Sequence, residues 1–323
     1  MSQPDQPQGP CLQYFPITFF AVIMGLLGLA LATQAAAHAY DIGGVVPHLI
    51  LAVGVSGFLA VAGLYGAKAV RYPQAVRAEW GHPVKLSFFP TVSISLLLMA
   101  AALHATWPGL AHVIWLLGAV GQGVLTLSVV TGWISHRAFE LGHLTPAWFI
   151  PAVGNVVVPL AGAPLGYVEL SWLFFSAGLV FWVILLTLVF NRLVFHDPIP
   201  ARLFPTMVIL IASPAVAFLA YVQLTGGIDP FARILLNAAY LFALIVLVQF
   251  PKLLRLPFVL SWWALSFPVA ALTAASFRYS VLVQSGAHRT VGVLALIVLA
   301  VIIVGLVLRT TRLIMAGGLC QPD

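Results

Sequence analysis

The chain has 323 residues, of which 62% are hydrophobic and only 7% are charged, against roughly 25% charged residues in soluble domains. So few charges cannot cover a soluble fold, and the composition therefore indicates an integral membrane protein with helical spans. The net charge of +6 does not indicate nucleic-acid binding, because the basic residues are scattered singly at the ends of apolar segments.

Apolar runs of about 20 residues, each long enough to cross roughly 30 Å of hydrocarbon, predict ten membrane-spanning helices. They cover residues 16–35, 45–67, 87–105, 109–133, 147–163, 167–191, 203–224, 230–250, 257–277 and 289–309. No Lys or Arg precedes Lys68, so the first apolar run lacks the positive segment of a signal peptide and is expected to be a retained span. We expect one membrane domain over 15–312, with polar tails over 1–14 and 313–323.

The basic residues predict the orientation of these spans. Eleven of the fourteen Lys and Arg residues fall in segments on the N-terminal side of the membrane. Only Arg233, Arg278 and Arg289 fall on the other side. Because loops rich in Lys and Arg are retained in the cytoplasm, both termini are expected to be cytoplasmic.

The odd-numbered spans share a proline at or near their start, and several carry a second one deeper. The opening pairs are Phe15-Pro16, Phe89-Pro90, Ile150-Pro151, Phe204-Pro205 and Leu256-Pro257. The deeper prolines are Pro159, Pro214 and Pro268, and the interiors of the even-numbered spans contain none. A proline breaks the helical hydrogen-bond ladder, which a membrane tolerates only against protein or a water-filled cavity. The pattern predicts an all-α fold of five helical hairpins in a quasi-five-fold arrangement, with odd helices around a central pore and even helices facing lipid.

The predicted inner helices have no Asp, Glu, Lys, Arg or His away from their ends. Their polar side chains are neutral: Thr18, Ser93, Ser95, Asn155, Ser213, Ser261, Ser266 and Thr273. Proton-coupled carriers usually need an ionisable relay within the membrane, so a neutral lumen favours weak binding and passive conduction. The nine histidines lie in loops or at span ends without a His-x-x-x-His pair, and no nucleophile–base motif appears. We therefore expect no metal, no cofactor and no enzymatic activity.

The ninth span places one large ring at a break in its helix. Pro268 has no N–H for the carbonyl of Ala264, which predicts a kink there. Ala264 and Ala271 lie three residues before and four residues after Phe267, so its ring stands beside a track of small side chains. A phenyl ring in a narrow lumen fills the cross-section and offers an ion no polar partner in place of lost hydration. Phe267 is therefore the expected gate.

Three stretches of the chain carry more specific motifs. They are Trp262–Pro268 (WWALSFP), Pro205–Met207 together with Ala212–Ala215, and Arg77–Val84 (RAEWGHPV). These stretches resemble the tellurite-resistance/dicarboxylate transporter family, the TehA-like proteins, which includes the plant guard-cell slow anion channels. The resemblance covers roughly residues 14–312.

This resemblance implies ten spans in five hairpins and a homotrimer in which each subunit has its own anion pore. It also implies closure by a phenylalanine of the ninth span, which falls on Phe267. The small residue of the first span that accommodates such a gate falls near Ala21, where relatives more often have glycine.

The residues and the resemblance together predict a passive channel or facilitator in the bacterial inner membrane, with small inorganic or organic anions and the lipid bilayer as partners. The residues expected to line or kink the pore beside Phe267 are Ala21, Ser95, Pro159, Pro214, Ala264, Pro268 and Ala271. The alternative is a proton-coupled exporter of C4-dicarboxylate, sulfite or tellurite-like oxyanions. The lack of intramembrane carboxylates counts against that alternative.

Overall fold

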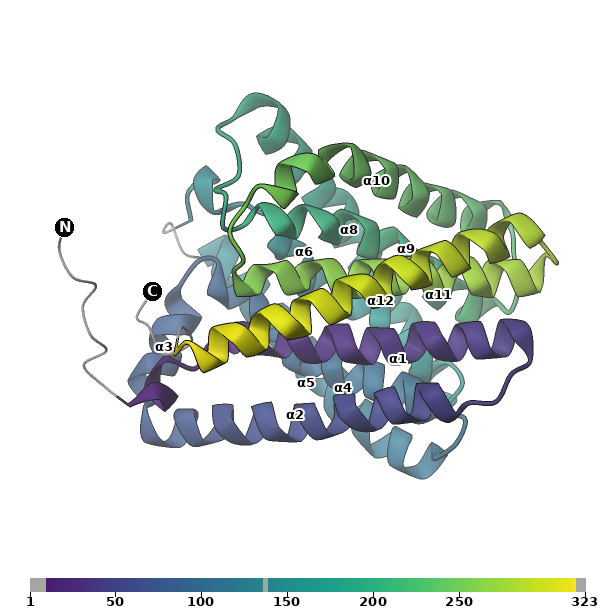
Figure 1. Cartoon of the computed structure of the whole chain (residues 1–323), viewed down its shortest axis with the longest axis horizontal. Helices are drawn as coiled ribbons and strands as arrows, with labels where there is room; N and C mark the ends of the chain where they lie inside the picture. Colours follow the sequence, from purple (N-terminus) through teal and green to yellow (C-terminus); the bar gives the residue numbers. More distant parts are fainter. Residues whose placement is uncertain (1–9, 136–138, 318–323) are drawn as a thin grey trace.

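The computed structural model describes residues 10–135 and 139–317, and within these ranges the chain is helical with no strand (Figure 1). The α-helices are α1 (Phe20–Tyr40), α2 (Val45–Arg71), α3 (Pro73–Gly81), α4 (Pro90–Leu103), α5 (Pro108–Ser135), α6 (Phe149–Val157), α7 (Pro159–Gly162), α8 (Val168–Phe195), α9 (Ile209–Thr225), α10 (Pro230–Leu254), α11 (Ser266–Leu282) and α12 (Gly286–Met315). The 3₁₀ helices are η1 (Cys11–Tyr14), η2 (Ile17–Phe19), η3 (Lys85–Phe88), η4 (Leu141–His143), η5 (Pro146–Trp148), η6 (Phe204–Val208) and η7 (Leu260–Leu265).

Nine helical segments of the described chain are long and apolar enough to cross a membrane. Four of them, built on α1, α4, α9 and α11, have 56% to 78% of their most apolar stretch buried inside the protein. In the other five, α2, α5, α8, α10 and α12, only 22% to 33% of that stretch is buried. Segments of the first kind therefore form the interior, and segments of the second kind present apolar side chains to the surroundings.

The segment predicted as the fifth span, 147–163, is not one of these nine. It is divided into η5, α6 and α7. The break between α6 and α7 falls at Pro159, which has no N–H to continue the hydrogen-bond ladder of α6. The backbone N–H of Val158 instead bonds the carbonyl of Asn155 in a tighter turn, at 3.2 Å. This segment is nevertheless as buried as the four inner helices.

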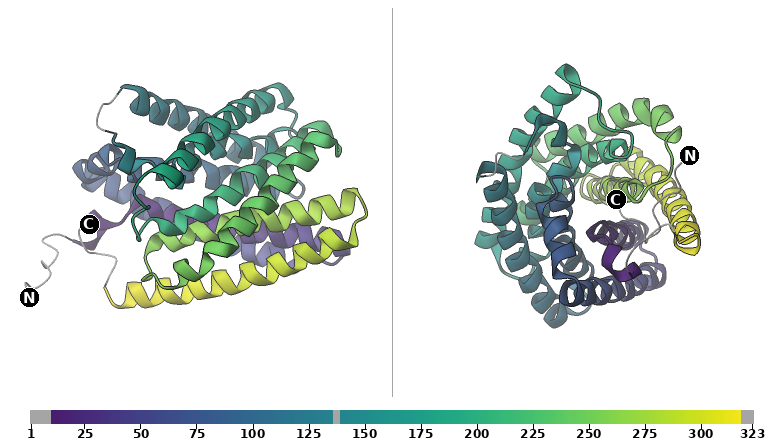
Figure 2. Two further views of the ribbon diagram at one scale, coloured as in Figure 1. Left: turned by 90° about the horizontal axis from the view of Figure 1, so that it is seen from above. Right: turned by 90° about the vertical axis from the view of Figure 1, so that its left-hand side faces the viewer.

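The buried segments contact one another in a closed order around the molecule. Each inner helix touches the next in the sequence α1, α4, α6, α9, α11 and back to α1. Each also packs against the long helix that follows it in the chain, with α2 on α1, α5 on α4, α8 on α6, α10 on α9 and α12 on α11. The right-hand view of Figure 2 looks along these helices and shows the less buried ones around the outside.

Five 3₁₀ helices repeat the closed order at one end of the molecule. In turn, η2, η3, η5, η6 and η7 each contact the next, and η7 contacts η2. A proline lies within or just before each of η2, η5 and η6, where the first turn has no bonding partner for an N–H group. The starts of the five inner segments therefore meet at the same end.

Two glycines of α1 allow a close approach between α1 and α11. A Cβ at Gly25 would lie 2.3 Å from Ser266 Oγ, and a Cβ at Gly28 would lie 3.0 Å from Ala270 Cβ and 3.3 Å from the Phe267 ring. Any larger residue at Gly25 would push α1 away from α11. The contact between these two helices therefore depends on glycine.

The structure adds features that the apolar runs did not predict. Residues 73–81, expected as a loop, form α3, which buries Glu79 and leaves Arg77 exposed. The last helix extends to Met315, beyond the predicted domain boundary at 312, and η1 lies within the predicted N-terminal tail. Residues 1–9 and 318–323 of the predicted tails lie outside the described residues.

Candidate functional site

A cavity of about 40 Å³ lies at the centre of the inner helices. All five inner segments contribute to its wall. The lining residues are Ala21, Met24, Phe88, Thr91, Ile94, Ile150, Val157, Ile209, Ala212, Trp263, Ala264, Phe267 and Pro268. The cavity therefore lies where any continuous path through the ring of inner helices would pass.

The wall of this cavity is almost entirely apolar. Its two polar side chains, Thr91 and Trp263, direct their hydrogens elsewhere: Thr91 Oγ1 donates to the carbonyl of Phe88, and Trp263 Nε1 donates to Thr310 Oγ1 at 2.9 Å. No lining side chain is ionisable at neutral pH. A solute inside the cavity would find neither a charge partner nor a strong hydrogen-bond donor.

Phe267 occupies the start of α11, and its environment differs in detail from the predicted kink. The chain changes from the 3₁₀ helix η7 to α11 at Ser266, so Pro268 lies in the first turn of a new helix and not within a longer bent one. A proline costs little there, because N–H groups in a first turn lack helical partners. The Phe267 ring is 9% exposed, borders the cavity and lies against Gly28 of α1.

The structure brings together half of the predicted site residues. Ala21, Ala264 and Pro268 line the cavity with Phe267. Ser95, Pro159, Pro214 and Ala271 are buried in inner segments but do not line it. Ser95 Oγ donates to the carbonyl of Thr91 at 2.7 Å, so this hydroxyl is used within its own helix.

Sequence reasoning missed the aliphatic part of the wall and the glycine beside the ring. Met24, Ile94, Val157 and Ile209 look like any other apolar residue of a span, and no local signal marks them as lining. Gly28 could have been found, because Gly25 and Gly28 stand one helical turn apart on α1.

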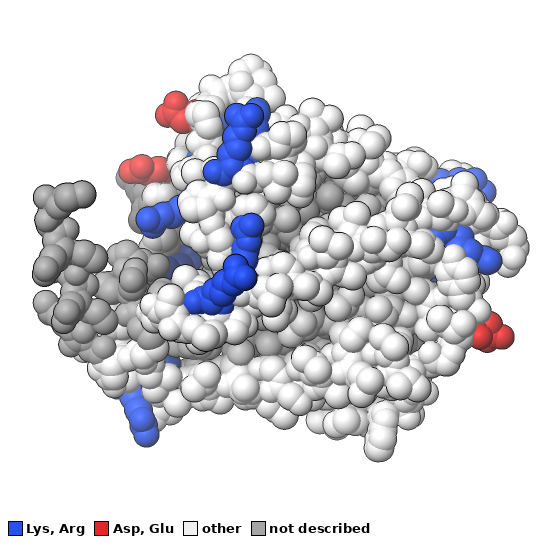
Figure 3. All heavy atoms as spheres, in the orientation of Figure 1, with Lys and Arg blue, Asp and Glu red and all other residues white. Residues whose placement is uncertain are grey.

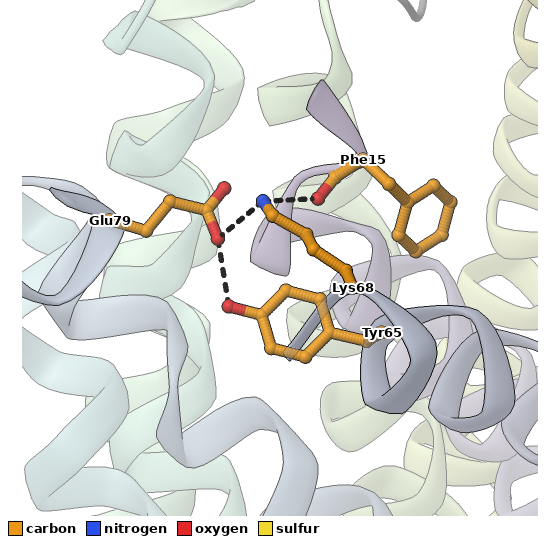
Figure 4. A network of polar contacts seen from close by, with 4 residues as sticks. All are labelled: Phe15, Tyr65, Lys68 and Glu79. Atoms are coloured by element: carbon orange, nitrogen blue, oxygen red, sulfur yellow. Dashed lines mark hydrogen bonds and ion pairs between the residues drawn. The ribbon is translucent and has the colours of Figure 1, made fainter. Parts of the chain in front are cut away.

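A buried ion pair secures the end of the molecule where the inner segments start (Figure 4). Lys68 Nζ lies 3.1 Å from Glu79 Oε2 and donates to the carbonyl of Phe15 at 2.8 Å. The Tyr65 hydroxyl donates to the same Glu79 oxygen at 2.8 Å. The network ties α2 and α3 to the residue immediately before Pro16, and so fixes where the first inner segment begins.

Arg192 makes a similar contact in another hairpin. This arginine lies in the last turn of α8 and is 4% exposed, and its Nη1 donates to the carbonyl of Leu144, two residues before η5. A basic side chain at the end of an outer helix thus holds the start of the inner segment in both places. Sequence reasoning had interpreted Lys68 and Arg192 only as orientation signals.

Other charged residues lie toward the two ends of the molecule, as Figure 3 shows for one face. At the end opposite the 3₁₀ helices, Asp229 caps α10 by accepting from the N–H of Ala232 at 2.8 Å. The Tyr221 hydroxyl donates to Asp229 at 2.6 Å, and this hydrogen bond lowers the pKa of the Asp229 carboxyl below its ordinary value. The apolar middle and charged ends suit a protein that spans a bilayer.

The sequence matches the model of the voltage-dependent anion channel family over residues 14–311. The chain belongs to this family. The family consists of anion channels and transporters and not of enzymes, and the chain is a multi-pass membrane protein of this family.

Relatives come from plants, bacteria and archaea. The S-type anion channel SLAH2 of Arabidopsis thaliana is 28% identical over 288 residues, which cover 86% of this chain and 55% of the relative. The tellurite resistance protein TehA homolog of Haemophilus influenzae is 28% identical over 273 residues, covering 83% of each chain. An uncharacterized transporter of Methanocaldococcus jannaschii, MJ0762, is 26% identical over 291 residues, covering 82% of this chain and 84% of the relative.

The chain spans about half the length of two of the plant channels that it matches, 55% of SLAH2 and 46% of SLAH3. The match confirms the resemblance to the TehA-like proteins and slow anion channels on which the sequence prediction drew.

The buried ion pair generates a prediction about stability. Lys68→Met leaves the Glu79 carboxylate buried without its cation, and the loss of unfolding free energy is expected to be about 3–5 kcal/mol. Adding Glu79→Gln removes the stranded charge and should restore part of that loss. Arg71→Met, three residues along α2 at an exposed position, is the matched control and should have little effect. Equilibrium unfolding in detergent measures all three, and equal stability of Lys68→Met and Arg71→Met would contradict the role of the pair.

Proposed function

We propose that this protein is a passive channel or facilitator for small anions whose path runs through the central cavity. The observation that carries the proposal is the composition of the cavity wall: all five inner segments contribute to it, and none of its residues is ionisable. An anion that meets no fixed partner binds weakly and leaves quickly, as conduction requires. A proton-coupled exporter would need a proton relay along the same path, and the wall provides none.

The proposed architecture is ten membrane spans in five hairpins. It counts the interrupted segment of η5, α6 and α7 as the fifth span, because this segment is buried in the ring between α4 and α9. A broken helix can remain in a membrane when protein or an aqueous path covers its free backbone groups. We place the protein in the bacterial inner membrane, with the end that carries the 3₁₀ helices and both termini on the cytoplasmic side, as the excess of basic residues predicts.

We assign the gate to Phe267. Its ring borders the cavity, is nearly buried, and projects from a first helical turn where the backbone changes from 3₁₀ to α geometry. Ala264 and Ala21 border the same space, so the ring has only small neighbours on those sides of the cavity. A change of side-chain rotamer would widen the path without a movement of helices.

The proposal includes the homotrimer that the resemblance implies. Many large apolar side chains on α2, α5 and α12 are exposed on a single chain, and these surfaces are compatible with either lipid or a neighbouring subunit. Native mass measurement in mild detergent is expected to return a complex of three chains. A protein that is only monomeric while its anion flux is intact would remove the trimer from the account.

The gate generates the prediction that tests the function. Phe267→Ala removes the obstruction from the cavity, and anion flux into liposomes is expected to rise severalfold for equal amounts of folded protein. Phe218→Ala is the matched control, because Phe218 is a fully buried ring of α9 that does not line the cavity. This control should lose stability through packing without a rise in flux. An unchanged flux from well-folded Phe267→Ala would exclude Phe267 from gating.

A further inference from the structure

Two side chains of the outer helix α5 bind two backbone carbonyls of the broken inner segment. Gln122 Nε2 donates to the carbonyl of Pro151 at 2.9 Å, and Trp115 Nε1 donates to the carbonyl of Val158 at 2.9 Å. The two donors, Trp115 and Gln122, are seven residues apart, and so are the two acceptors, Pro151 and Val158. Because seven residues make about two helical turns, the two members of each pair lie on the same face. The two bonds therefore form a matched pair along neighbouring elements.

The Gln122 end of this pair belongs to a larger buried network. Ser93 Oγ of α4 lies 2.7 Å from Gln122 Oε1, and Gln122 Nε2 also reaches Thr126 Oγ1 at 3.0 Å. Asn155 Nδ2 of α6 donates to the same Pro151 carbonyl at 3.2 Å. Thr126 Oγ1 lies 3.2 Å from the same Pro151 carbonyl and 3.3 Å from Asn155 Oδ1, so Gln122, Asn155 and Thr126 gather around this one carbonyl.

Gly154 of α6 provides the space for this network. A Cβ at position 154 would lie 2.3 Å from Gln122 Nε2 and 2.6 Å from Gln122 Cδ. The amide of Gln122 is therefore seated directly on the backbone of α6, and any side chain at position 154 would displace it.

The inner segment that accepts these bonds has the shortest α-helices of the five inner segments. It comprises α6, with nine residues, and α7, with four, and is interrupted by Pro159, whereas the other inner helices are longer and continuous. Ile150 and Val157 of α6 line the cavity. Each is next to a clamped carbonyl, since Ile150 precedes Pro151 and Val157 precedes Val158.

We propose that Gln122 and Trp115 form a clamp that sets the position of α6 and thereby the width of the anion path at Ile150 and Val157. Gln122 is a positioning residue, because it acts through α6 and does not itself line the cavity. The inference rests on the proposed function for its effect on permeation. The placement of α6 by the clamp is a separate statement that can be tested without any transport measurement.

The test compares Gln122→Met, which preserves side-chain length and removes the amide, with the wild type. The first readout is hydrogen–deuterium exchange of the backbone amides over 149–158 in detergent. The second readout is the nitrate-to-chloride permeability ratio of the protein reconstituted into bilayers, measured with Gln122→Met added to Phe267→Ala. Losing an interhelical hydrogen bond in a membrane changes an equilibrium constant by a factor of about three, so the exchange rate is expected to rise by about that factor. The permeability ratio is expected to differ from that of Phe267→Ala alone.

A second set of variants separates positioning from general stability. Gly154→Ala should displace the Gln122 amide and reproduce both changes, and adding it to Gln122→Ala should produce little further change, because the space is then free. Gly121→Ala is the matched control on α5, since its new Cβ would only touch Ser93 Cβ at 3.5 Å. If Gln122→Met gives no folded protein, Trp115→Phe is measured in the same way; it removes the indole N–H bond to Val158 together with part of the ring that stacks on Tyr167.

The outcomes are distinct. Unchanged exchange over 149–158 in a folded variant would overturn the clamp. Faster exchange with an unaltered permeability ratio would reduce these bonds to structural support and overturn the link to the path. If neither the wild type nor Phe267→Ala carries anion current, the proposed function fails together with that link, and the exchange data alone then decide whether the clamp positions α6.

Discussion

The interior of a bilayer offers no water to a backbone N–H or C=O group, and the structure of this protein depends on that constraint. Its inner segments begin in 3₁₀ helices and carry prolines, so they leave carbonyls without helical partners. Such segments are stable only when other protein groups surround them. The long outer helices fulfil this requirement by packing on the inner segments, and their own apolar side chains then face outward.

Side chains of the outer helices also supply specific hydrogen bonds to the inner backbone. Lys68 of α2 and Arg192 of α8 donate to carbonyls just before inner segments, and Gln122 of α5 donates to a carbonyl within one. Each of these donors is buried, and burying such groups costs free energy unless they are hydrogen-bonded. The inner segments can consequently be irregular and still well placed around the cavity. The wall of the central cavity has no ionisable side chain.

Much of this arrangement could be predicted from the sequence because its determinants are local. Apolar runs mark the spans, and the prolines of the odd-numbered spans mark the segments that turn out to be buried. Phe267, Pro268, Ala21 and Ala264, which the sequence analysis assigns to the gate or the pore lining, border the central cavity. The family match confirms the resemblance that those motifs suggested.

The remainder depends on contacts between distant residues, which periodicity does not reveal. Nothing near Lys68 in the sequence identifies Phe15 as its acceptor, and nothing near Gln122 identifies Pro151. Pro159 and Pro214 have the same local appearance as Pro268, but they lie away from the cavity, because the lining depends on the rotation of each helix and not on its breaks. The interruption of the fifth predicted span at Pro159, in contrast, follows from a local feature, because this proline has no N–H to continue the helix.

The central claim is that the ring of inner segments encloses a passive path for anions. Voltage clamp of planar bilayers containing the reconstituted wild-type protein tests it most directly, under an anion gradient and then under a pH gradient alone. The account predicts a current that reverses at the Nernst potential of the anion and does not respond to the pH gradient. Electrically silent anion flux that requires the pH gradient would contradict it and favour a proton-coupled exporter.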